Sequence, residues 1–256
     1  EALQSIPDEL SPIAAEALIT MATPHLYWRD LDVALQCAER GLEIAQRLQL
    51  NELLPIAYAT LGNVVTRRGE TARAESCLRQ AMELSRGLGL ETYAQVMAAG
   101  FLAYNLCGQG RVDEARQLIE TAMWPYMGSS DTYEICVCRS VLADIALEGG
   151  QMGEAERLFE SLLEVDRRRQ YRIPLAMVCF GLAYVYLTTG RKRQGLELAA
   201  ESLQLLEPTG ALQLYLDQGE RARVVCEALL GAGLHSVFLS RVLEAQKAAP
   251  VVEVTA

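Results

Sequence analysis

Small side chains recur along this chain at intervals of 40 or 41 residues, in two parallel series. The first series falls at Ala22, Gly62, Ala103, Ala143 and Ala183, and the second at Ala34, Ala74, Ala115, Ala155 and Gly195. A leucine directly precedes four members of the first series. So regular a spacing predicts an internal repeat, in which a chain folds into stacked copies of one unit instead of a single irregular core.

Each repeat is predicted to be two amphipathic helices joined by a short turn. A glycine stands between the two small residues of the later repeats, at Gly69, Gly110, Gly150 and Gly190. Such a glycine ends a helix at little cost because it tolerates the left-handed backbone conformation. The small residues belong where two helices cross most closely, since larger side chains would push the backbones apart.

The stretch from Pro55 to Ser85 resembles the tetratricopeptide pattern. Leu61 and Gly62 lie on its first helix, Gly69 is at the turn, and small or apolar residues follow on the second helix. The sequence therefore predicts an all-α, tetratricopeptide-like, right-handed superhelical solenoid of about five helix pairs with a terminal helix pair and almost no strand.

We expect one solenoid domain over residues 1–250 and a tail or linker at 251–256. The repeats and terminal helices are expected at about 8–50, 51–90, 91–130, 131–172, 173–208 and 211–247. The first helix is expected to end near Ala22, before a turn at His25–Arg29 that lacks glycine. After Pro208, one longer helix is expected from about Ala211 to Leu230, and the last from about His235 to Lys247.

The chain is acidic, with a formal charge of −10 and a pI of about 4.9. An acidic surface repels a phosphate backbone, which argues against nucleic-acid binding by this chain. Two clusters of basic residues, at 167–169 and 191–193, fall at predicted helix ends. We interpret them as solvated groups that complement helix C-termini.

Seven cysteines lie mostly inside helical patterns, as small core residues do. Their spacing indicates neither a disulfide framework nor a metal site, which predicts reduced thiols. The sequence shows no signal peptide and no apolar run of 18 residues. We therefore expect a cytoplasmic protein that does not contact a membrane.

Catalytic motifs are absent from the sequence. It contains no phosphate-binding GxxxxGK[ST] and no GxSxG, and its two histidines, His25 and His235, stand far apart. Its carboxylates lie beside basic residues, as on a solvated helix face. The sequence predicts a protein that is not an enzyme and has no cofactor and no metal.

Binding is predicted on the first helices of the repeats, which line the concave side of tetratricopeptide solenoids. The residues expected there are Asn63, Arg67, Met97, Phe101, Tyr104, Asp144, Met177, Phe180 and Tyr184. Aromatic side chains with a few polar groups suit a small organic ligand or an extended peptide. Alternatively, the methionines and phenylalanines pack between adjacent repeats. Ala59 replaces the first lysine of the carboxylate clamp of chaperone adaptors, which argues against capture of a peptide C-terminus.

A narrower resemblance concerns the period and the end of the chain. A period near 40 is similar to the helical sensor domain of MalT-type, large ATP-binding LuxR-family transcription regulators. The segment Leu216-Asp217-Gln218-Gly219-Glu220, followed by apolar helices up to Ala245, resembles the stretch before the linker to the DNA-binding domain of that family. The resemblance implies effector sensing, contacts with other domains of the same polypeptide, and possible self-association.

The main alternative is a free-standing scaffold that binds partner proteins or peptides. The chain begins with Glu1 inside an ordinary repeat and ends shortly after Pro250. We expect it to be a fragment of a larger protein, in which a nucleotide-binding domain and a helix-turn-helix would distinguish a regulator from a scaffold.

Overall fold

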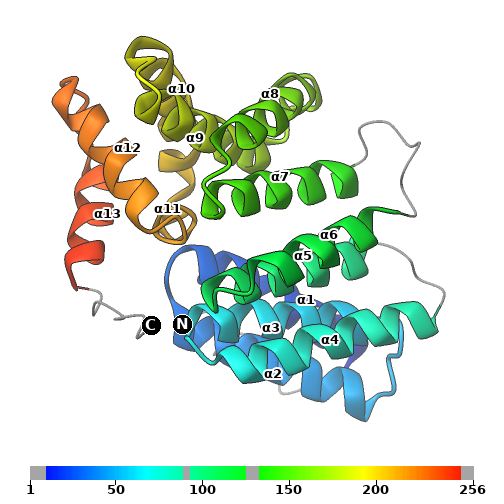
Figure 1. The fold of residues 1–256 in the computed structure, drawn as a ribbon. Coiled ribbons are helices and arrows are strands. Elements are labelled where there is room, and N and C mark those ends of the chain that lie inside the picture. Colours follow the sequence, from blue (N-terminus) through cyan, green and yellow to red (C-terminus); the bar gives the residue numbers. More distant parts are fainter. Residues whose placement is uncertain (1–9, 89–92, 125–132, 249–256) are drawn as a thin grey trace. The chain divides into compact units, whose positions relative to one another are not determined.

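The computed structural model describes residues 10–88, 93–124 and 133–248, and all their regular elements are helices (Figure 1). This confirms the all-α prediction. The described helices are α1 (Pro12–Tyr27), α2 (Leu31–Arg47), α3 (Leu54–Arg67), α4 (Thr71–Gly87), α5 (Tyr93–Gly108), α6 (Val112–Met123), α7 (Tyr133–Glu148), α8 (Met152–Arg169), α9 (Arg172–Thr188), α10 (Lys192–Leu206), the 3-10 turn η3 (Glu207–Thr209), α11 (Leu212–Leu216), α12 (Glu220–Gly231) and α13 (Val237–Ala248).

Along the chain, the first ten helices follow one another as the five expected successions of a first and a second helix, from α1 and α2 to α9 and α10. Every turn within a pair passes through a residue with positive φ. The glycines at 69, 110, 150 and 190 have φ between 70° and 86°. Arg29 adopts the same conformation, with φ 71°, in the first pair. The missing glycine therefore changes the residue at this turn and leaves its geometry the same.

The small residues lie where the repeat pattern requires them. All the alanines of both series are completely buried. A Cβ added to Gly62 would lie 2.5 Å from the Cγ of Leu78, a side chain of the second helix of the same pair. No real Cβ contact is so short, so the close approach of α3 and α4 depends on glycine at this position.

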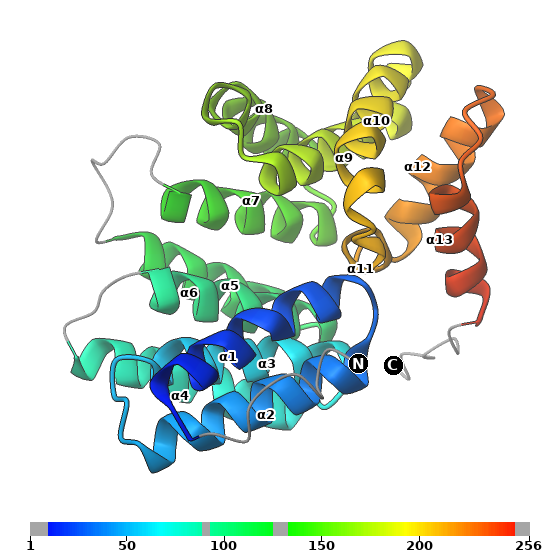
Figure 2. The ribbon, with the colours of Figure 1, turned by 180° about the vertical axis from the view of Figure 1, so that it is seen from behind.

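The chain divides into two compact units, one ending at Leu158 and one beginning at Phe159, within α8. In the first unit, α5 packs against both α3 and α7, and it lies between them in both views (Figures 1 and 2). The first helices of successive repeats therefore share one side of this unit. The expectation of one solenoid over residues 1–250 stays a prediction.

The second unit has its core around Tyr215 of α11. The Tyr215 ring makes edge contacts with Phe180, at 4.8 Å between ring centroids, and with Phe238 of α13, at 5.4 Å. Its hydroxyl and that of Ser202 of α10 share a hydrogen bond of 3.0 Å inside the core. Burial raises the pKa of this phenol far above its ordinary value. These contacts join the terminal helices to the α9–α10 pair.

Two helix boundaries differ from the sequence prediction. Helix α1 continues through Pro24 to Tyr27, beyond the predicted end at Ala22, because its last turn buries Leu26. The sequence prediction of a single helix at 211–230 is wrong. The structure has two helices there, α11 and α12, which are separated by a break at 217–219. Gly219, with φ 52° and ψ −126°, has a backbone conformation that no helix contains.

The predicted tail or linker at 251–256 lies outside the described residues. None of the helices in the described ranges is long and apolar enough to cross a membrane.

Candidate functional site

Three of the predicted binding residues come together on α3 and α5. Asn63 of α3 and Tyr104 of α5 occupy equivalent positions in consecutive repeats, and Arg67 lies one turn after Asn63. The Arg67 guanidinium donates to the Asn63 side-chain oxygen, and it lies 5.1 Å from the centroid of the Tyr104 ring. We call Arg67 and Tyr104, together with Phe101 of α5 and Asp144 of α7, which are predicted to lie beside them, the first-helix face.

The residues of the first-helix face differ in what they offer to a ligand. Tyr104 is exposed at 38% of its surface, whereas Arg67, Phe101 and Asp144 are half-buried. Asn63 is buried and orients Arg67 through its side-chain oxygen. Met97, one turn before Phe101 on α5, is half-buried. Arg67 and Tyr104 thus offer an aromatic ring beside a guanidinium held in a fixed direction, and the carboxyl group of Asp144 is predicted to lie near them.

The predicted residues on α9 belong to the second unit, and one of them needs correction. Met177 and Tyr184 are half-buried, but Phe180 is completely buried and packs on Tyr215. The expectation that Phe180 faces a groove is therefore wrong. Two repeats separate Phe101 from Gly181, so Phe180 corresponds to the core position of Gly100. Whether Met177 and Tyr184 share a surface with the first unit stays a prediction.

Arginine–carboxylate pairs link neighbouring second helices, which the sequence analysis did not anticipate. Within the first unit, Arg73 of α4 pairs with Glu39 of α2 at 2.5 Å, and Arg111, the N-cap of α6, pairs with Glu75 of α4 at 2.8 Å. Arg79 pairs with Glu75 within α4 and with Glu114 of α6. Hydrogen bonds from Arg111 and Arg79 lower the pKa of the Glu75 carboxyl group. The sequence signal for these links is an arginine and a carboxylate separated by slightly less than one repeat, such as the 34 residues between Arg73 and Glu39.

Grooves lie between second helices in both units. The unit-1 groove has a volume of about 560 Å³ between α2 and α4, with Leu61 of α3 among its lining residues. The unit-2 groove has about 540 Å³ between α8 and α10, with Leu182 of α9 among its lining residues. Six positions of the two linings correspond at a constant separation of 121 residues, which is three repeats: Glu39 and Glu160, Leu42 and Leu163, Glu43 and Glu164, Gln46 and Arg167, Leu61 and Leu182, Arg73 and Gln194.

The unit-1 groove neutralises its own charges. Its two carboxylates, Glu39 and Glu43, are paired with Arg73 at 2.5 Å and with Arg40 at 2.7 Å. Both arginines line the same groove.

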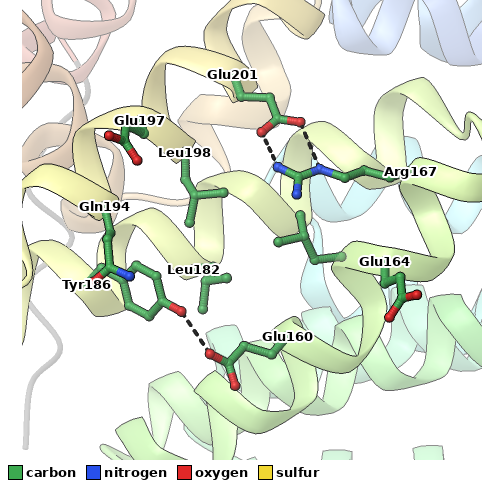
Figure 3. A pocket seen from close by; sticks show the side chains of 10 residues that line it. Glu160, Glu164, Arg167, Leu182, Tyr186, Gln194, Glu197, Leu198 and Glu201 are labelled. Atoms are coloured by element: carbon green, nitrogen blue, oxygen red, sulfur yellow. Dashed lines mark hydrogen bonds and ion pairs between the residues drawn. The ribbon is translucent and has the colours of Figure 1, made fainter.

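The unit-2 groove keeps an excess of negative charge. Four glutamates and only one arginine line it, and this arginine, Arg167, pairs with Glu201 (Figure 3). Glu160, the equivalent of Glu39, accepts a hydrogen bond of 2.8 Å from the Tyr186 hydroxyl. Gln194 stands where the unit-1 groove has Arg73. Arg191 covers the Tyr186 ring at 3.9 Å and thereby fixes its orientation.

A buried carboxyl group lies on α8, close to this groove in the sequence but on the core side of the helix. Asp166 is 1% exposed, and its Oδ1 has no hydrogen-bond partner among the described residues. Burial raises its pKa from 3.8 to about 6. Cys179 of α9 is also buried, and burial is the main cause that raises its pKa to about 12. The thiol is therefore protonated and unreactive at neutral pH.

Cysteines and possible metal ligands are the remaining reactive groups of the structure. None of the seven cysteines, all of which lie in the described ranges, forms a disulfide, and each is buried or half-buried. Among the described residues, no group of three or more His, Cys, Asp or Glu is placed to hold a metal ion.

Comparison with known proteins gives a family match over most of the chain. The model of the MalT-like TPR region matches residues 1–230. No curated protein matches the sequence.

Solved structures with similar folds have low sequence identity. A Rap protein complexed with competence and sporulation factor has 12% identity and a TM-score of 0.67, covering 90% of this chain and 74% of that one. The Cut9 and Hcn1 hetero-tetramer of APC/C has 14% identity and a TM-score of 0.60, covering 94% and 44%. BtubC from P. vanneervenii has 18% identity and a TM-score of 0.55, covering 88% and 96%. At these identities the likeness concerns the fold.

Proposed function

Because this chain belongs to the family of MalT-like TPR regions, we propose that it is the non-catalytic, effector-sensing and protein-interaction domain of a MalT-like, LuxR-family transcription regulator. It binds a small-molecule or protein signal on the first-helix face and acts in the cytoplasm. The observation that carries this proposal is the convergence of Arg67 and Tyr104 from consecutive repeats on one surface.

The chemistry of this surface suits a ligand with an acidic group beside an apolar one. Asn63 accepts a hydrogen bond from the Arg67 guanidinium and so limits its rotation before any ligand arrives. A charged donor held in this way binds a carboxylate or phosphate with less loss of side-chain entropy. The exposed Tyr104 ring offers a stacking surface beside it. A peptide or a small organic acid meets both requirements.

A ligand on this face touches more than one repeat, which connects binding with regulation. Arg67 belongs to α3 and Tyr104 to α5, and α5 packs against both α3 and α7. A ligand that contacts two first helices favours one packing of the repeats over another, and only such a difference in affinity shifts a population. The Rap protein with its bound factor supports the proposal as an example of ligand binding by a protein with this fold.

A stand-alone scaffold that binds partner proteins or peptides is the second candidate. Its support is the hetero-tetramer of Cut9 and Hcn1, in which a protein with this fold belongs to an assembly. The reading frame around this domain separates the two candidates. A nucleotide-binding domain and a helix-turn-helix in the same frame support the regulator, and their absence from the full-length protein supports the scaffold.

The binding experiment compares the first-helix face with an exposed aromatic residue elsewhere. A panel of organic acids and short peptides is screened by thermal shift, and each hit is titrated calorimetrically against wild type, Tyr104→Ala, Arg67→Met and the control Trp124→Ala. Trp124 is 75% exposed at the end of α6. We expect at least 10-fold weaker binding in the first two variants and no change in the control. Hits that bind all four proteins equally would exclude this face as the site.

A further inference from the structure

The unit-2 groove combines an apolar floor with carboxylates at its rim. Leu163, Leu182 and Leu198 line it together with Tyr186. Glu164 has no ion-pair or hydrogen-bond partner among the described residues, and Glu197 is only 3.5 Å from the exposed Arg193. Figure 3 shows Leu182 and Leu198 between Glu160 at one end of the groove and Glu201 at the other. The groove is thus lined for a group that is apolar along its length and positively charged at its tip.

The equivalent groove in the first unit shows which group fits such a lining. There the Arg73 side chain extends from α4 across the groove, and its guanidinium reaches the Glu39 carboxylate at 2.5 Å. Glu160 is the repeat equivalent of Glu39, and Leu182 is the equivalent of Leu61. The carboxylate and the leucine floor are therefore kept in the second unit, whereas the arginine is replaced by Gln194.

We propose that the unit-2 groove binds an arginine side chain presented by a partner protein, in the place that Arg73 fills in the unit-1 groove. The guanidinium lies against Glu160 and Glu164, and its three methylene groups cover Leu163 and Leu182. Gln194 leaves the space open that an arginine at this position would occupy. This docking site is separate from the first-helix face and does not depend on the ligand proposed there.

Charge complementarity and shape both favour arginine over a compact cation. A guanidinium forms two parallel hydrogen bonds to a carboxylate, and its aliphatic stem packs on apolar surface. Tyr186, held by Arg191 and by its hydrogen bond to Glu160, keeps that carboxylate directed along the groove. Arg167 is engaged with Glu201 and leaves the negative charge of Glu160 and Glu164 uncompensated within the lining. A partner segment that carries arginine supplies the missing charge.

The test uses the whole chain and a dye-labelled peptide that contains two arginines, with fluorescence anisotropy at low salt. The matched probe is the same peptide with citrulline in place of arginine, because citrulline keeps the shape and removes the charge. Free argininamide is the third probe. We expect the citrulline peptide to bind at least 10-fold more weakly than the arginine peptide. We also expect free argininamide to bind more weakly than the arginine peptide.

The decisive variant is Gln194→Arg, which places an internal guanidinium in the groove as Arg73 does in the first unit. We expect it to weaken peptide binding at least 10-fold while the thermal midpoint stays equal or rises. Arg73→Gln is the matched control. We expect it to leave peptide binding at the unit-2 groove unchanged, or to add a second, weaker peptide site at the unit-1 groove. If Gln194→Arg disturbs folding, the double variant Glu160→Gln, Glu164→Gln replaces it.

Three results would overturn the proposal. These are equal binding of the arginine and citrulline peptides, full binding by a folded Gln194→Arg protein, and binding of argininamide as tight as that of the peptide. The last result would assign the groove to a free small cation instead of a protein partner. None of the three bears on the first-helix face, so this proposal and the proposed function fail independently.

Discussion

The grooves of the two units are built on the same positions and differ in their charge. Each has leucines below and glutamates on the second helices, and six lining positions correspond at a separation of three repeats. In the unit-1 groove, arginines on the same helices occupy the carboxylates, whereas in the unit-2 groove Gln194 leaves Glu160 without an arginine. The repeat therefore preserves the shape of a surface, while one substitution within it changes what the surface binds.

Core positions differ between the units in a compensated way. The ring of Phe159 fills the space beside Gly181, where an added Cβ would lie 2.3 Å from the Phe159 Cζ. The equivalent positions in the first unit hold Ala38 and Thr60, both buried. The second unit therefore combines the large Phe159 with a glycine, whereas the first unit combines the small Ala38 with the larger Thr60.

The largest expected effect follows from this exchange. Gly181→Thr, which copies the first unit, should lower the free energy of unfolding by about 3 kcal/mol, because the added atoms overlap the Phe159 ring. Urea denaturation measures this loss. In a protein that already carries Phe159→Ala, Gly181→Thr should lower the free energy of unfolding by at least about 1 kcal/mol less than it does in wild type, because the effects of substitutions at residues in contact are not additive.

The matched control for this pair is Thr60→Gly in the first unit, where no ring occupies the equivalent position and a smaller loss is expected. Additive effects of Gly181→Thr and Phe159→Ala would mean that the two sites relax independently and that the compensation does not exist.

The second prediction concerns Asp166, whose equivalent in the first unit is the buried Ala45. The pKa of this carboxyl group is about 6 in the folded chain, against an ordinary value of 3.8. A group with a higher pKa in the folded state takes up protons on folding, so the free energy of unfolding falls as pH rises from about 4 to 6 and then levels off. Asp166→Asn should remove this fall and be about 2 kcal/mol more stable than wild type at pH 8.

Denaturation of both proteins at pH 4, 6 and 8 measures the difference between them. A difference that stays constant over this range would show that Asp166 has the same pKa in both states, and its burial would then need another explanation.

The third prediction exchanges the charges of the two grooves. Arg73→Gln should lower the free energy of unfolding by about 0.5 kcal/mol, because it removes the ion pair with Glu39 on a partly exposed surface. Gln194→Arg should raise it by a similar amount by forming the corresponding pair with Glu160. Both changes should shrink in about 1 M salt, where charges are screened within about 3 Å. Equal effects at low and high salt would indicate packing instead of charge.

The smallest effect is expected at the turn of the first pair. Arg29 has φ 71°, where later repeats have glycine. Arg29→Gly removes the strain of a left-handed non-glycine residue, about 1 kcal/mol, but it adds about 0.5–1 kcal/mol of conformational entropy to the unfolded chain. Thermal denaturation should show a gain of a few tenths of a kcal/mol. A loss would mean that the Arg29 side chain stabilises the turn. Gly69→Arg, the reverse change at the next turn, should lower stability.

The sequence by itself determined the helix pairs, their turns and the family. Small residues every 40 or 41 positions can be satisfied only by a repeated close crossing of two helices, and the structure places all the alanines of both series in the core. From the second repeat on, the turn glycines likewise indicated where each first helix ends, because positive φ is costly for other residues. These are local requirements, which the order of residues states directly.

The surfaces were decided by tertiary structure. The sequence placed Phe180 in the groove because Met177 and Tyr184 are spaced near it for one helix face. Phe180 is, however, one residue before the position equivalent to Phe101, and this offset directs its side chain into the core against Tyr215, 35 positions away. The contact of Arg67 with Tyr104 and the open space beside Gln194 arise between different helices, so no local pattern in the chain records them.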